Sequence, residues 1–116
     1  MVAGITSVLN LGNYYGWADR ELREQIDRGE AVGPRLQVAG FYLTVPGGGG
    51  DLLEPGGKEE DIPPHMRLGV SRSPEEFRRN AQAAADGGAD VLKVIASGAV
   101  LAYGGVPGEP EMTPAE

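Results

Sequence analysis

The chain has 116 residues, with 17 acidic and 10 basic side chains and a formal net charge of -7. This balance argues against nucleic acid and anionic membranes as partners, because both are bound through a local surplus of Lys and Arg. The length is enough for one domain, and the absence of cysteine excludes disulfides, thiolate metal sites and a Cys nucleophile.

The amino-terminal residues carry no targeting signal that we recognise. Residues 1–5 lack the basic region and the long apolar core of a signal peptide. No apolar run approaches the roughly 20 residues needed to span a bilayer. We therefore expect a soluble protein of the cytoplasm.

The first two predicted elements are a strand and a helix. Residues 4–11 are mostly apolar and rich in branched side chains, which predicts a strand. Residues 17–28 predict a helix, because Leu22 and Ile26 are spaced four apart on one face. Gly29 stands where a left-handed C-cap would end that helix.

The next elements repeat this order after a long interruption. Residues 36–44 predict a second strand, and an irregular stretch over residues 46–72 follows, of a length that is usually functional or disordered. The segment Ser73-Pro74-Glu75-Glu76 predicts that a helix begins here and runs over residues 74–86, because it has the pattern of a capping box with proline at the first helical position. Residues 91–96 then predict a third strand.

The alternation predicts an α/β fold of three parallel strands joined by two crossover helices. The strands are nearly continuous apolar runs, as in a sheet covered on both faces. Residues 113–116 repeat the cap pattern that precedes the second helix, with a capping residue, then a proline, and a glutamate three residues after the cap. The first strand begins almost at Met1. We therefore expect the natural chain to continue on both sides, the alternative being a small three-layer domain with frayed ends.

Lys93 is the most informative single residue, because it interrupts the apolar run VLKVIA. Strand alternation places it on one face with Val91 and Ile95. A lysine in this position must reach water, find a counter-charge or lose its proton. The alternative interpretation is a lysine that extends to solvent from the end of the strand.

Two further features are candidate ligand sites. The run Gly47–Gly50 could bind a phosphate through backbone N–H groups, but no Gly-Lys-Ser/Thr follows it, and a mobile loop is the alternative. Its position after a parallel strand is typical of ligand sites. His65 is the only histidine, and a lone loop histidine is usually solvated. Without a His pair, the chain cannot build a complete metal site from the usual ligands.

Residues 87–98, GGADVLKVIASG, resemble the fourth-strand region of metal-dependent amidohydrolases in the imidazolonepropionase-like and prolidase-like group. Residues 4–12 resemble the second strand of that family, residues 29–36 the turn into the third, and residues 46–51 the loop after it. The resemblance covers almost the whole chain. It implies a TIM-type (β/α)₈ barrel, of which residues 1–116 are a single segment that supplies strands two to four.

The resemblance also implies a metal-dependent chemistry. Lys93 matches the lysine that becomes carboxylated and bridges two divalent metals, which we expect to be zinc. Such metals position and acidify a water for attack on a carbon–nitrogen bond. The family's first-strand HxH would precede Met1 and its later histidines and aspartate would follow Glu116, so residues 1–116 alone are expected to be inactive.

The implied substrates are dipeptides, N-acylated amino acids or cyclic amides. The resemblance assigns the rim of the pocket to residues 44–51 and 97–105, with Gly48, Gly49 and Asp51 as substrate-binding residues. Two alternatives stay open: a non-catalytic module that binds a phosphorylated small molecule through Gly47–Gly50, and an inactive truncated product. The sequence predicts no oligomeric state.

Overall fold

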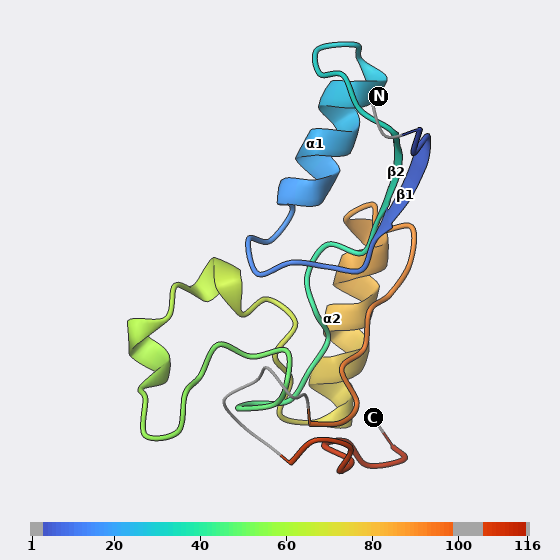
Figure 1. Cartoon of the computed structure of the whole chain (residues 1–116). Coiled ribbons are helices and arrows are strands. Elements are labelled where there is room, and N and C mark those ends of the chain that lie inside the picture. Colours follow the sequence, from blue (N-terminus) through green and yellow to red (C-terminus); the bar gives the residue numbers. More distant parts are fainter. Residues whose placement is uncertain (1–3, 99–105, 116) are drawn as a thin grey trace.

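The computed structural model describes residues 4–98 and 106–115 (Figure 1). Its elements in chain order are β1 (Ser7–Asn10), α1 (Ala18–Asp27), β2 (Arg35–Val38), the 3-10 helices η1 (Glu59–Asp61) and η2 (Pro64–Met66), and α2 (Pro74–Asp86). Among the described residues, no helix has the length and apolar content required to cross a membrane.

β1 and β2 form a parallel pair with α1 as the connection between them. The register runs from Ser7 opposite Arg35 to Asn10 opposite Val38. This pair confirms the predicted parallel arrangement for the first two strands. Both strands are shorter than predicted, since the sequence indicated residues 4–11 and 36–44.

Gly40 explains why β2 ends at Val38. Its φ of +71° lies in the left-handed region, which interrupts an extended strand. A Cβ at this position would also lie 2.7 Å from Cζ3 of Trp17, so the backbone needs glycine to approach the ring. After Gly40, residues 41–44 make isolated parallel bridges, from Phe41 to Asn13, from Leu43 to Val94 and from Thr44 to Val70.

The third predicted strand, residues 91–96, is not formed as a strand in the described part of the chain. One parallel bridge joins Val94 to Leu43, with Leu43 N–H donating to Lys93 O at 2.8 Å and Ile95 N–H donating to Leu43 O at 2.9 Å. The direction is therefore as predicted, and the prediction of a full third strand was wrong.

The ladder of this third segment is broken at its start. The carbonyl of Val38 accepts from both Asp90 N–H at 2.8 Å and Val91 N–H at 3.4 Å, and the Asp90 carboxylate accepts from Val38 N–H at 2.9 Å. A side chain thus takes the place of a ladder carbonyl. The sequence showed an apolar run there but could not show this exchange.

Both predicted helices are confirmed. Gly29 follows α1 with φ +73°, as expected for a left-handed C-cap. At α2, Ser73 Oγ accepts from Glu76 N–H at 3.2 Å, while the Glu76 carboxylate accepts from the N–H of Arg72 at 2.8 Å. The reciprocal bond of the capping box therefore reaches one residue further back than the usual pattern.

The core lies between α2 and the chain that follows β2. Its buried residues are Phe41, Leu43, Phe77 and Ala84, with Trp17, Ala81, Ala89 and Met112 packed against them. The rings of Trp17 and Phe41 meet edge to face at 5.5 Å. This core fixes the carboxyl ends of the parallel segments against α2.

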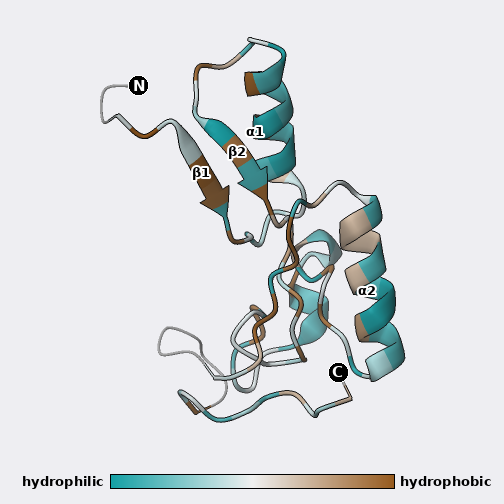
Figure 2. Ribbon diagram, turned by 90° about the vertical axis from the view of Figure 1, so that its right-hand side faces the viewer, coloured by the Kyte–Doolittle hydropathy of each residue, from teal (hydrophilic) through white to brown (hydrophobic). Residues whose placement is uncertain are grey.

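The outer side of the sheet is apolar and exposed. β1 is an edge strand, and Figure 2 shows it as a hydrophobic ribbon at the margin of the molecule. Val8 is 38% and Leu9 46% exposed, and the flanking Ile5 and Leu11 are more exposed still. The face of α1 predicted to be buried is also partly open, with Leu22 47% exposed.

Candidate functional site

The carboxyl ends of the parallel segments meet near one group of loops. β1 leads into residues 11–17, the chain after β2 leads into the glycine loop (residues 47–51), and residues 91–96 lead into Ser97. Ligands of parallel α/β folds bind at this end of the strands. We call this region the carboxyl-end site.

Lys93 lies on the predicted face of its segment. Val91, Lys93 and Ile95 are half-buried, whereas Leu92, Val94 and Ala96 between them are exposed, which is the expected alternation. On the same face, Ile95 approaches the glycine loop, because a Cβ on Gly50 would lie 3.0 Å from Ile95 Cγ1. Lys93 therefore belongs to the segment face that borders the glycine loop.

The described surroundings of Lys93 do not make a complete metal centre. Within residues 4–98 and 106–115, no carboxylate forms an ion pair with its amine. The same residues contain no group of three or more His, Cys, Asp or Glu side chains placed to hold a metal. The role of Lys93 as a ligand stays a prediction.

The glycine loop uses its own backbone donors internally. Gly47 N–H donates to the Asp51 carboxylate at 3.0 Å and Gly49 N–H to the Glu111 carboxylate at 2.9 Å. Gly48 N–H donates to Val45 O at 3.0 Å and Gly50 N–H to Thr44 Oγ1 at 3.3 Å. A phosphate would find these donors occupied and two carboxylates behind them, so the geometry argues against a phosphate cradle.

Asp51 is an enclosed carboxylate, and its side chain is 0% exposed. Arg67 Nε and Nη2 donate to its two oxygens at 2.8 and 2.6 Å, a two-pronged ion pair. Burial alone would raise the pKa of Asp51, but the Arg67 guanidinium and the N–H of Gly47 outweigh it and hold this pKa below its ordinary value. The hydrogen bonds to Asp51 in turn raise the pKa of Arg67.

The three predicted substrate-binding residues are brought together in the glycine loop, but they are largely enclosed. Gly48 and Asp51 are buried and Gly49 is half-buried. Their contact with a substrate stays a prediction. Of the other predicted rim, residues 97–105, only Ser97 and Gly98 lie within the described residues. His65 lies in η2 and is exposed, as predicted for a solvated loop histidine.

Sequence reasoning missed the side chains that hold the glycine loop. Arg67 and Glu111 lie 16 and 62 residues from the loop atoms that they contact. Oε1 of Glu111 is buried and has no hydrogen-bond partner in the described part of the chain. No local pattern marks contacts of this range, although an Arg within a long acidic stretch was a weak sign of an ion pair.

Two tyrosines at the carboxyl-end site were also missed. The rings of Tyr14 and Tyr42 meet edge to face at 4.9 Å, and Tyr42 Oη donates to Gly12 O at 3.0 Å. Burial, and after it Tyr42 and Asp51, raise the pKa of Tyr14, so its phenol stays a neutral donor. The aromatic pair Tyr14-Tyr15 directly after the first strand was the available signal.

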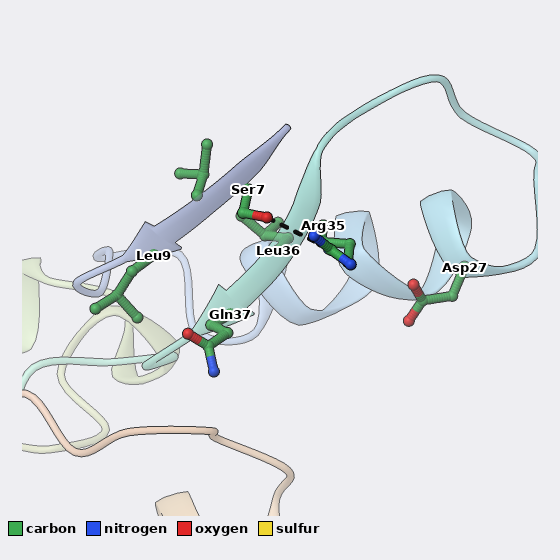
Figure 3. A pocket seen from close by; sticks show the side chains of 7 residues that line it. Ser7, Leu9, Asp27, Arg35, Leu36 and Gln37 are labelled. Atoms are coloured by element: carbon green, nitrogen blue, oxygen red, sulfur yellow. Dashed lines mark hydrogen bonds between the residues drawn. The ribbon is translucent and has the colours of Figure 1, made fainter. Parts of the chain in front are cut away.

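A separate hollow of about 490 Å³ lies over β1 and β2, away from the glycine loop (Figure 3). Ser7, Leu9, Arg35 and Gln37 line it from the strands and Asp27 from α1. Arg35 Nε donates to Ser7 Oγ at 3.3 Å across it. It is open to solvent and is not formed by the residues predicted to carry the chemistry.

The fold of almost the whole chain matches parts of several larger solved structures. A Xaa-Pro dipeptidase with methionine in its active site matches with a TM-score of 0.80 and 27% identity over 96% of this chain. A prolidase complexed with N-methylphosphonate-L-proline matches with a TM-score of 0.80 and 28% identity over 97%. The ochratoxinase of A. niger matches with a TM-score of 0.73 and 25% identity over 97%.

The present chain is much shorter than these proteins. It spans 27% of the dipeptidase chain, 28% of the prolidase chain and 27% of the ochratoxinase chain. No curated protein sequence matches it. The sequence profile of the Amidohydrolase family matches residues 2–116. The matched α/β elements are part of a TIM-barrel fold, and the chain belongs to the amidohydrolase family.

Proposed function

We propose that residues 1–116 supply strands two to four of a metal-dependent hydrolase that acts on carbon–nitrogen bonds, with Lys93 as its carboxylated metal ligand. Family membership over residues 2–116 supports the hydrolase class. The likeness to a Xaa-Pro dipeptidase and to a prolidase supports small dipeptides as the first substrates to test. N-acylated amino acids and cyclic amides are the further candidates.

The observation that carries the proposal is the place of Lys93. Lys93 belongs to the half-buried face of its segment that borders the glycine loop, and no carboxylate forms an ion pair with it in the described part of the chain. A neutral lysine amine can capture carbon dioxide as a carbamate, which is an anion with two oxygens. Two divalent metals held partly by that carbamate would supply an acidified water for attack on the amide.

The alternative function, phosphate binding by Gly47–Gly50, is not supported by the contacts of the loop. All four glycine N–H groups are used within the protein, and two of their acceptors are carboxylates. An anionic ligand would meet repulsion there rather than free donors. For residues 1–116 alone we propose no hydrolysis, because one ligand cannot hold two metals.

The test uses the protein expressed from the complete reading frame around residues 1–116. Lys93 should carry the added mass of carbon dioxide, and Lys93→Ala should lose bound metal and lower turnover by several orders of magnitude. Lys93→Arg should fail in the same way, because a guanidinium stays protonated and forms no carbamate. A short carboxylic acid added to Lys93→Ala should restore part of the activity by standing in for the carbamate.

Lys58 provides the matched control, since it is the only other lysine and its side chain is 72% exposed. Lys58→Ala should leave metal content and turnover unchanged. If Lys93→Arg kept near-normal metal content and rate, Lys93 would not be a ligand, and the interpretation as a lysine reaching solvent would hold.

A further inference from the structure

The glycine loop is held from outside by one buried ion pair. Asp51 ends the loop, accepts the N–H of Gly47 at its start, and faces the two-pronged guanidinium of Arg67 at 2.6 and 2.8 Å. The side chain of Arg67 is only 11% exposed. The conformation of the loop therefore depends on a contact made by a residue 16 positions further along the chain.

Arg67 is held by a second contact within residues 52–69, a segment that we call the excursion. Arg67 Nη1 donates to the Glu59 carboxylate at 2.9 Å, and Glu59 also forms an ion pair with Arg72. The excursion returns beside Thr44, in the segment that follows β2, where Thr44 N–H donates to Gly69 O at 3.1 Å and Ser71 N–H to Thr44 O at 2.9 Å. Figure 1 shows this segment, in green and yellow-green, projecting to one side of the lower part of α2 before the chain enters that helix.

We propose that Arg67 is a positioning residue, which sets the shape of the substrate rim by holding Asp51 and with it the glycine loop. The statement that the loop is a substrate rim rests on the function proposed above. Arg67 acts through Asp51 and forms no hydrogen bond or ion pair with Lys93 within residues 4–98 and 106–115, so its removal should weaken substrate binding and leave the proposed metal ligand in place.

The single substitution Arg67→Met has two effects. It removes the contact that holds the glycine loop, and it leaves the buried Asp51 carboxylate without a counter-charge, which destabilises the fold. The double variant Arg67→Met with Asp51→Asn also removes the buried charge and should recover the folded yield. If Arg67 merely neutralises Asp51, the double variant will behave as wild type in every assay.

With the active protein and a dipeptide substrate, both variants should raise KM by about tenfold or more while kcat and bound metal change by less than about threefold. Glu59→Gln is the matched control, because it removes the exposed partner of Arg67 and keeps the pair with Asp51. It should leave KM within about twofold of wild type. A double variant with wild-type KM would overturn the proposal.

A second readout separates this proposal from the proposed function. If the wild-type protein hydrolyses no amide, the proposed function fails, and hydrogen exchange at the amides of residues 47–51 then decides the role of Arg67. The double variant should exchange at least about tenfold faster there than wild type and Glu59→Gln. Equal exchange in all three proteins would show that Arg67 does not hold the loop.

Discussion

At the scale of single residues, charge placement decides what the carboxyl-end site accepts. Two carboxylates, from Asp51 and Glu111, stand behind a loop that sequence alone could present as an anion cradle. Only one of them has a cationic partner, Arg67, among the described residues. The half-buried face that Lys93 shares with Val91 and Ile95 could be predicted from the sequence, because alternation within one short segment is a local signal. Arg67 and Glu111 could not, because their contacts join distant parts of the chain.

The Asp51–Arg67 pair predicts a specific pH dependence. The ordinary pKa of Asp51 is 3.8, and the folded value is lower. The stabilisation is therefore complete above the unfolded pKa and is lost as the pH falls through the lower folded pKa. Asp51→Asn should remove this part of the acid sensitivity. Urea unfolding of the complete protein between about pH 6 and pH 3 measures it. Identical pH profiles for wild type and Asp51→Asn would contradict this assignment.

At the scale of elements, the order and direction were predictable and the lengths of the strands were not. Hydrophobic runs and cap residues indicated α1 and α2 almost to their ends. Strand ends depended on contacts across the fold, such as Gly40 against Trp17 and Asp90 against the backbone of Val38. A run of apolar residues shows that a segment can be buried, but it does not show where a ladder is interrupted.

Gly40 therefore offers a test at this scale. Gly40→Ala should lower the free energy of unfolding by about 2–4 kcal/mol, because a left-handed alanine is strained and its Cβ would press on the Trp17 ring. Gly29→Ala is the control, since Gly29 has a similar φ of +73° but nothing within 4 Å of an added Cβ. It should cost only about 1–2 kcal/mol. Equal losses in urea unfolding of the two variants would show that the Trp17 contact is unimportant.

At the scale of the whole molecule, many large apolar side chains are exposed to solvent instead of being buried in the core. Ile5, Leu9, Leu11 and Leu92 are each 46% or more exposed, and the edge of β1 that faces away from β2 has no partner strand within residues 4–98 and 106–115. In the matched structures, residues equivalent to these elements make up about a quarter of a larger chain. An uncovered apolar strand edge is a site for association with other chains.

Residues 1–116 expressed alone should therefore self-associate and bind a hydrophobic dye, without a sharp unfolding transition. The protein from the complete reading frame is the comparison, and it should unfold cooperatively because the same surfaces are covered. Light scattering and thermal scans measure both properties. A reversible, sharp transition of a monomeric 116-residue chain would count against this prediction.

The excursion is closed twice at its base. Thr44 bridges to Val70, and Asp51 pairs with Arg67 inside that closure. Its tip, including Lys58 and His65, is exposed. Doubling the length of a flexible loop costs only about 0.6 kcal/mol in closure entropy, so inserted residues there should lower the free energy of unfolding only slightly. We therefore expect that a recognition segment inserted in the excursion would lie beside the carboxyl-end site and would leave the segment that carries Lys93 in place.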